Sequence, residues 1–379
     1  MQRDFHYYAT YAAAILAGYP HEAGVRVAWS AAFADFCTRT FLEMIGGPLS
    51  AATAQFQSEL LDANTDPVGL QDITRIWASF HFLPGDLYAE REKCSRQYLR
   101  KYRMICNPNS PLLAETVELA KGRGEEAAGL AMHVLADTWA HRYFAGTPSL
   151  AINNTDDYFY ELREDGWRKI RFNHNPASPD DPEKGIYTNS LYQGDENSVM
   201  NLGHGRAGHL PDYSYACYKY LPAWGAYREI VKDNPDDYMH AFSQMVFALK
   251  YLRENRAEDR FETARYAQEE VLPYRDRIDA VLRKRQTDAS ADWKAFGEML
   301  SGQSIPDFQS DRYQQEYMDA NADEKEGTFL GRFIYAALAQ KSMVTNRIFA
   351  SGSLLAGFSV DYDQKGFRGI RDFRILMKR

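Results

Sequence analysis

The chain has 379 residues, of which 45% are hydrophobic and 25% are charged, a balance typical of globular proteins. Its net charge is −8, and no basic run is long enough to bind along DNA, so a duplex nucleic-acid partner is not expected. The polar N-terminus does not resemble a signal peptide, and the apolar run from Tyr11 to Ala17 is too short to span a membrane. We therefore expect a cytoplasmic protein without a transmembrane segment.

The four cysteines are widely spaced and form no CxxC pair; they are Cys37, Cys94, Cys106 and Cys217. This spacing favours free thiols in a reducing compartment, although four cysteines also allow two disulfides.

In chain order, proline and glycine positions and apolar periodicity predict mostly helical structure. The expected helices cover residues 4–16 (with Asp4 as N-cap), 20–35, 111–126, 129–146, 213–220, 238–253, 261–286, 293–300 and 331–351. Residues 147–200 are rich in Asn, Asp, Pro, Ser and Gly, which predicts a long ordered loop. Residues 358–362 are strand-like. We divide the chain into a metal-site core (1–236) and a C-terminal helical extension (237–379).

The most informative stretch is the helix predicted over residues 129–146. His133, Asp137 and His141 follow one another at intervals of four, which places them in one stripe along the helix. The positions around them are apolar, as in a buried helix. Because buried polar groups are costly unless something satisfies them, the stripe suggests a divalent metal. The alternative is a hydrogen-bonded core network in which Asp137 bridges two histidines.

Other positions supply ligands of the same kind. Asp35 closes a helix of small residues, and His81 stands on a turn after an apolar segment. Asp35 could equally be a capping or paired carboxylate.

A second informative stretch combines glycines, histidines and an acid. It contains His204, Arg206, His209 and Asp212. The glycines between them allow close backbone approach, and Arg206 suits an anion. The alternative is a glycine-rich turn with Asp212 capping the helix expected over 213–220.

The order of these residues resembles the zinc-dependent phospholipase C and fungal single-strand nuclease superfamily. The resemblance rests on His6, Asp35, the His-Phe at 81, the His-x3-Asp-x3-His at 133–141 and His209, and covers about residues 1–220. The opening Asp-Phe-His-Tyr-Tyr-Ala-Thr-Tyr also looks like that of an uncharacterised bacterial family related to this superfamily.

The resemblance implies an all-α fold, a helical bundle with a long loop insertion and additional C-terminal helices, and a cluster of two or three zinc ions. Asp35, His81, His133 and Asp137 would hold the first metal. His141, His209 and Asp212 would hold the second, and His6 with bridging Asp137 the third. Asp4 and His204 are additional candidates.

The chain departs from the superfamily pattern at three places. His141 follows Asp137 by four residues instead of six, the terminal residue is Met1, and the last pair is His209 with Asp212 instead of His-x3-Glu. The number of ions is therefore open, and iron, nickel or manganese would also suit these ligands.

These residues suggest a metal-dependent hydrolase of a small phosphoester, with a metal-activated water as the nucleophile. Asp35 or Asp212 would orient that water, and Arg206, with Arg142 as a weaker candidate, would take the charge on phosphate. The alternative is a non-catalytic helical protein with a structural, fully ligated metal. A nucleotide phosphohydrolase built on an adjacent His-Asp pair is disfavoured because the chain has no such pair.

Overall fold

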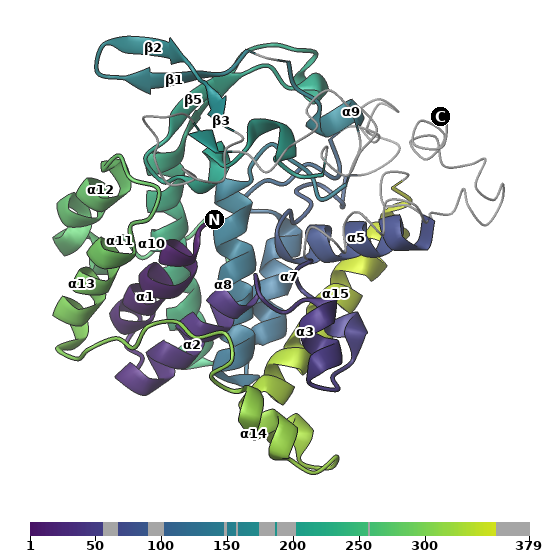
Figure 1. Cartoon of the computed structure of the whole chain (residues 1–379). Coiled ribbons are helices and arrows are strands. Elements are labelled where there is room, and N and C mark those ends of the chain that lie inside the picture. The colour runs from purple at the N-terminus through teal and green to yellow at the C-terminus, as the bar shows by residue number, and fades with distance from the viewer. Residues whose placement is uncertain are drawn as a thin grey trace.

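The computed structural model describes residues 1–55, 67–89, 102–147, 150–156, 158–173, 186–187, 202–256 and 258–353. Most of these residues are helical, but a four-stranded antiparallel sheet lies across one end of the helices (Figure 1). The expectation of an all-α protein is therefore wrong, and the fold is mixed α/β. None of the described helices is long and apolar enough to cross a membrane.

Helices make up most of the structure. The first half of the chain forms a π-helical segment η1 (Asp4–Ala9), α1 (Thr10–Leu16), α2 (His21–Phe33), α3 (Arg39–Met44), α5 (Pro67–Phe80), α7 (Pro111–Ala120), α8 (Gly124–Ala140) and α9 (Leu150–Asn153). The second half forms α10 (Asn234–Glu254), α11 (Gln268–Val271), α12 (Arg275–Arg283), α13 (Ser290–Ser301), α14 (Gln314–Asp319) and α15 (Phe329–Ser351).

The central element is α8, which packs against α2, α7, α10 and α15. It is built from alanine, leucine, valine and methionine, and nearly every residue from Glu126 to Ala140 is buried. The closest approach is to α2, where a Cβ on Gly129 would lie 2.2 Å from the carbonyl oxygen of Val27. Gly129 therefore lets the two helix backbones approach closely.

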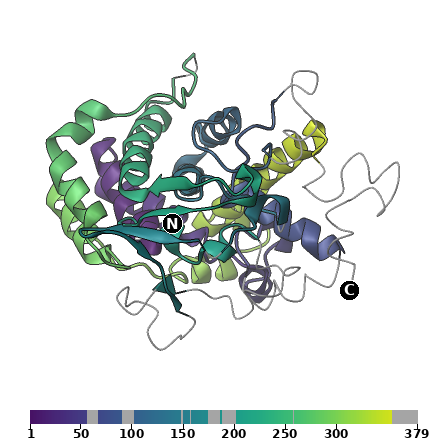
Figure 2. The same ribbon diagram turned by 90° about the horizontal axis from the view of Figure 1, so that it is seen from above.

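The strands form two sheets. β1 (Tyr160–Arg163), β2 (Gly166–Lys169), β5 (Cys217–Tyr220) and β6 (Ile230–Asp233) form the larger one in the order β2-β1-β5-β6, and β3 (Phe172–Asn173) pairs in parallel with β4 (Ile186–Tyr187). Seen from above, the larger sheet crosses the middle of the helices, with the N-terminus near the centre (Figure 2).

One strand of the larger sheet replaces a predicted helix, and β1 and β2 lie within residues 147–200, which were predicted to be a loop. Residues 213–220 contain strand β5, in which Tyr218 and Tyr220 are buried while Cys217 and Lys219 are partly exposed. This alternation is typical of a strand that covers a core with one face, and tyrosine favours strands. The strands were missed because each has at most four residues, too few to show a clear period.

The helix predicted over 261–286 is interrupted. Pro273 lies in a 3₁₀ turn (Leu272–Tyr274) between α11 and α12, and residues 261–267 are not helical. Proline lacks the N–H that a continuous helix would need at this position. The strand-like patch at 358–362 lies outside the described residues.

The N-terminal helix also differs in detail. Asp4 is the first residue of η1 and does not cap it as expected; its carboxylate accepts hydrogen bonds from the backbone N–H groups of Phe5 (2.7 Å) and Ala289 (2.8 Å). Asp4 therefore ties the start of the chain to the residue before α13.

The close approach at Gly129 gives a first prediction. We expect Gly129→Ala to lower the free energy of unfolding by about 1–3 kcal/mol, because the added methyl group must push α2 away from α8. Chemical denaturation measures the loss. Gly327→Ala is the control, since a Cβ there meets no atom within 4 Å. Equal stability of the two variants would contradict this account of the interface.

Candidate metal centre

The end of α8 gathers histidines and aspartates from distant parts of the chain. Among the residues that the structure describes, three sets each hold ligand atoms within 4.8 Å of one another: His6–His133–Asp137, Asp35–His81–His133 and His141–His204–Asp212. We call them the closed group, the open group and the distal group. His133 belongs to both the closed and the open group, and the distal group adjoins them because His141 Nδ1 lies 3.6 Å from Asp137 Oδ2.

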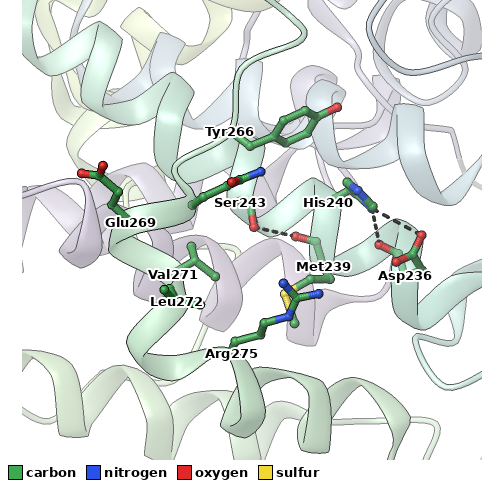
Figure 3. Close-up of a pocket in the computed structure, with 10 residues that line it drawn as sticks. Asp236, Met239, His240, Ser243, Tyr266, Glu269, Val271, Leu272 and Arg275 are labelled. Atoms are coloured by element: carbon green, nitrogen blue, oxygen red, sulfur yellow. Dashed lines mark hydrogen bonds and ion pairs between the residues drawn. The ribbon is translucent and has the colours of Figure 1, made fainter.

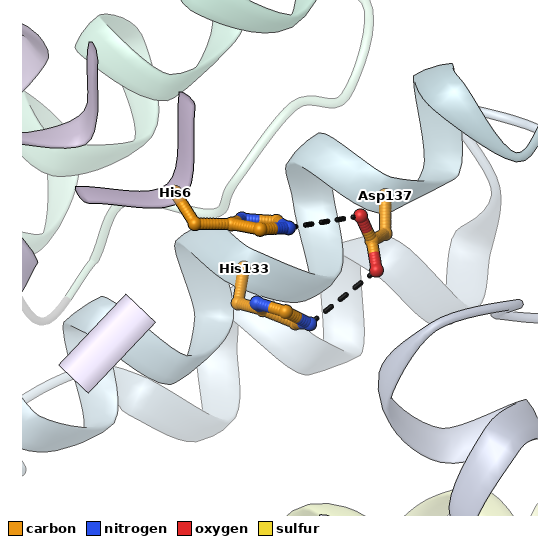
Figure 4. Close-up of side chains that lie close together, drawn as sticks. All are labelled: His6, His133 and Asp137. Carbon is orange, nitrogen blue, oxygen red and sulfur yellow. Dashed lines mark ion pairs between the residues drawn. The ribbon is translucent and has the colours of Figure 1, made fainter. Parts of the chain in front are cut away.

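The closed group is buried inside the protein. Figure 4 shows its three side chains, with His6 and His133 side by side and facing Asp137. The side chains of His6 and His133 are 0% exposed and that of Asp137 is 1% exposed. The two imidazoles stack with ring centroids 4.0 Å apart, and each points a nitrogen at Asp137: His6 Nε2 at 3.2 Å and His133 Nε2 at 3.3 Å. Neither nitrogen of His6 makes a hydrogen bond, because the contact with Asp137 lacks the required geometry.

The open group faces solvent on one side. His81 Nδ1 lies 3.8 Å from Asp35 Oδ1, and His133 Nε2 lies 3.9 Å from the same oxygen. The Asp35 side chain is 34% exposed and that of His81 is 11% exposed. A water or small ligand can therefore reach this group from outside.

The distal group contains His204 and not His209. His141 Nε2 lies 3.1 Å from Asp212 Oδ1, and His204 Nε2 lies 3.4 Å from Asp212 Oδ2. His209, predicted as a ligand, instead has its Nδ1 3.1 Å from Asp212 Oδ2 and is 27% exposed. It lies at the rim of the centre, while His204, only an additional candidate in the sequence, lies within it.

Backbone carbonyls fix the orientation of four imidazoles. His133 Nδ1 faces the oxygen of Ala31 (2.9 Å), His81 Nε2 that of Thr53 (2.8 Å), His141 Nδ1 that of His81 (2.7 Å) and His204 Nδ1 that of Gly208 (2.6 Å). A carbonyl oxygen only accepts, so each of these ring nitrogens carries the hydrogen. The second nitrogen of each neutral ring then carries a lone pair. Histidines that bind metals are commonly oriented in this way, with one ring nitrogen donating a hydrogen bond and the other facing the metal.

Those lone pairs point at one another and at carboxylates. His133 Nε2 and His81 Nδ1 are 3.2 Å apart, and both lie within 3.3 Å of Asp137 Oδ2. Three acceptors this close repel unless a cation lies among them. A metal ion among the three acceptors would remove this repulsion, and so would a proton on His81. The protonated arrangement is the hydrogen-bonded core network that the sequence left open as the alternative to a metal.

The pKa values follow from these contacts. Burial lowers the pKa of His6 to about 4, with a further contribution from His133. Burial would raise the pKa of Asp137, but the surrounding imidazoles and the Met1 amino group hold it well below its usual value. Asp137 is therefore an anion in a buried site, and an anion there needs compensating positive charge.

The amino group of Met1 lies inside the centre. It donates a hydrogen bond to Asp137 Oδ1 at 2.8 Å and lies 3.3 Å from both Asp212 Oδ1 and His141 Nε2. It thus contacts the closed and distal groups.

The remaining predicted residues occupy other positions. Among the described residues, Asp4 belongs to none of the three groups. Arg142 pairs with Asp237 at 3.4 Å. Arg206 is the middle residue of the 3₁₀ turn Gly205–Ala207, which begins directly after His204.

A separate pocket lies beside α10 (Figure 3). It measures about 400 Å³ and is lined by residues that include His240, Tyr266 and Arg275. His240 stacks on Trp139 with ring centroids 5.2 Å apart, and Trp139 lies two residues after Asp137, about 200° around the helix axis. None of the candidate ligands lines this pocket, so it is distinct from the metal centre.

The shared position of Asp137 gives a second prediction. We expect Asp137→Asn to remove all bound metal, because side chains of all three groups lie against the Asp137 carboxylate and the amide lacks its negative charge. Inductively coupled plasma mass spectrometry of the folded fraction measures the metal content. Asp237→Asn is the matched control, a buried aspartate that pairs with Lys232 at 2.6 Å outside the groups, and it should lose stability while retaining metal. Loss of metal from both variants would contradict the assignment.

The pKa of His204 gives a third prediction. Burial lowers it to about 4, so the unfolded chain takes up a proton below about pH 6.5 that the folded chain does not. The metal-free protein therefore loses stability from this group as the pH falls from about 6.5 to 4. We expect His204→Gln to make this dependence shallower by about 1.4 kcal/mol per pH unit, measured by denaturant titrations across that range. An unchanged pH dependence in His204→Gln would contradict this account.

Comparison with known proteins gives a family but no activity. Searches of curated proteins and of solved structures find no match. Residues 1–348 match a family of unknown function, DUF6765. That span includes all three ligand groups and almost all of the described fold. The chain belongs to the DUF6765 family.

Proposed function

We propose that this protein is a metal-dependent hydrolase that cleaves a phosphoester. The observation that carries the proposal is the unequal exposure of the centre. His6, His133 and Asp137 are sealed, whereas Asp35 and His81 of the adjoining open group reach solvent. A catalytic metal keeps a position for water or substrate, while a structural metal is fully ligated.

The donor set fits zinc. Imidazole nitrogens and carboxylate oxygens are its common ligands, and four of the histidines present one lone pair each. The orphaned nitrogens of His6 and the facing nitrogens of His81 and His133 fit a cation at the closed and open groups. Iron, nickel and manganese also bind such ligands. When bound, the metal supplies Lewis acidity, which makes water more acidic and offsets charge on a phosphoryl group.

Of the two carboxylates proposed to orient water, Asp35 is better placed. Asp212 is held by His141 and His209 at 3.1 Å each and is only 9% exposed. Asp35 is more exposed, and its Oδ1 stands nearly 4 Å from both histidines of the open group. Asp35 can therefore hold a water molecule by a hydrogen bond and accept a proton from it.

The substrate would be negatively charged at its phosphate. Arg206 lies two residues after His204, in the 3₁₀ turn Gly205–Ala207, so its guanidinium is the candidate to pair with that phosphate. A guanidinium can pair with two phosphate oxygens and take charge as it develops on them.

A structural role for one ion is compatible with this function. The closed group joins η1 to α8, and its three side chains have almost no exposure. A metal in this group would hold the N-terminal helix on the core. The hydrolytic role belongs to the open group.

A chromogenic assay gives a fourth prediction. We expect the metal-loaded protein to hydrolyse bis(p-nitrophenyl) phosphate or p-nitrophenyl phosphate, and Asp35→Asn to lower kcat/KM by about 10²–10⁴-fold, the range typical of a lost general base. Release of p-nitrophenol is followed by absorbance.

The control is Asp307→Asn, an aspartate 78% exposed that pairs with Lys294 outside the centre. It should retain full activity. Stoichiometric metal with no hydrolysis above the chelator-treated protein would leave the structural role as the function of the whole centre.

A further inference from the structure

Three rings form a stack beside the distal group. Phe82 is fully buried and lies between Trp77 and His141. Its ring centroid is 5.5 Å from that of Trp77 at an interplanar angle of 14°, and 4.5 Å from that of His141 at 20°. The imidazole of His141 therefore lies flat against a phenyl ring that is supported from behind.

The residue before Phe82 holds the same imidazole by its edge. The carbonyl oxygen of His81 accepts the hydrogen bond from His141 Nδ1 at 2.7 Å. The carbonyl sets the rotation of the ring within its plane, and the phenyl face sets its tilt. Together they aim His141 Nε2 at Asp212.

The outer edge of the Phe82 ring touches the loop that carries His204. A Cβ on Gly203 would lie 2.2 Å from Phe82 Cζ, and Gly203 has φ +57°. Only glycine allows this backbone to lie against the phenyl ring. The rings of Phe82 and His204 are 5.8 Å apart. Phe82 is therefore packed against one ligand of the distal group and against the backbone that positions a second.

We propose that Phe82 is a positioning residue that holds His141 and His204 in metal-binding orientation and so determines whether the distal group is occupied. The proposal rests on the metal centre of the proposed function, but it concerns metal binding and not the reaction. Among the ring contacts of the described residues, Phe82 meets His141 and His204 of the distal group and neither histidine of the closed group. Its loss should therefore affect one metal position selectively.

The test compares two leucine variants by metal titration. Phe82→Leu removes the flat face. Phe159→Leu is the matched control, because Phe159 is 2% exposed in the same aromatic cluster, packs edge-on against Phe172 and stacks on Tyr220, and has no ring contact with a histidine among the described residues. Isothermal titration with Zn²⁺ and the absorption spectrum with Co²⁺ are recorded for both. His204→Gln marks which equivalent belongs to the distal group.

We expect Phe82→Leu to weaken that equivalent by about 10–100-fold, the usual cost of removing a residue that orients a ligand, and to leave the other equivalents unchanged. Phe159→Leu should bind metal as the wild type does, although both variants lose stability. Gly203→Ala should reproduce the effect of Phe82→Leu, because its methyl group displaces the phenyl ring.

Equal metal binding by the two leucine variants would overturn the positioning role and leave the proposed hydrolase intact. A selective loss in Phe82→Leu from a protein that hydrolyses no phosphoester would support the positioning role and remove the proposed activity. A wild-type protein that binds no metal at the distal group would overturn the positioning role.

Discussion

The burial of one carboxylate governs this structure. Asp137 is 1% exposed in the last turn of the central helix, and its two oxygens are divided between different partners. Oδ1 faces the Met1 amino group and His6, while Oδ2 faces His81 and His133. An isolated carboxylate in such surroundings would be protonated or would prevent folding. The segments that bring imidazoles to Asp137 are therefore arranged around the need to compensate its charge.

Close helix packing makes that arrangement possible. Because Gly129 lacks a side chain, α2 approaches α8, and the carbonyl of Ala31 comes within 2.9 Å of His133 Nδ1. The same helix ends at Phe33, two residues before Asp35. One helix contact therefore orients a histidine of the centre and delivers a carboxylate to it.

The sequence could predict those features of the candidate site that depend on the spacing of residues along one helix. The stripe of His133 and Asp137 followed from the helical repeat, and His6, Asp35 and His81 followed from a resemblance in ligand order. The choice between His204 and His209 could not be made, because it depends on a bond from His204 to the carbonyl of Gly208 and on the packing of Gly203 against Phe82. The four-stranded sheet was missed because its strands have at most four residues each, and because the pairing of β1 with β5, which joins its two hairpins, connects residues far apart in the chain.

The hydrogen bond from Ala289 to Asp4 makes the position of His6 depend on residues that follow all the candidate ligands in the sequence. Every candidate ligand among the described residues precedes Tyr213, yet η1, which carries His6, is held from the far end of the chain. Phe5 packs edge-on against Trp293 of α13 with ring centroids 5.7 Å apart. A fragment that ended after the last ligand would contain all the donor atoms without the scaffold that places His6. The candidate metal centre is thus a property of the whole fold and cannot be transferred as an N-terminal module.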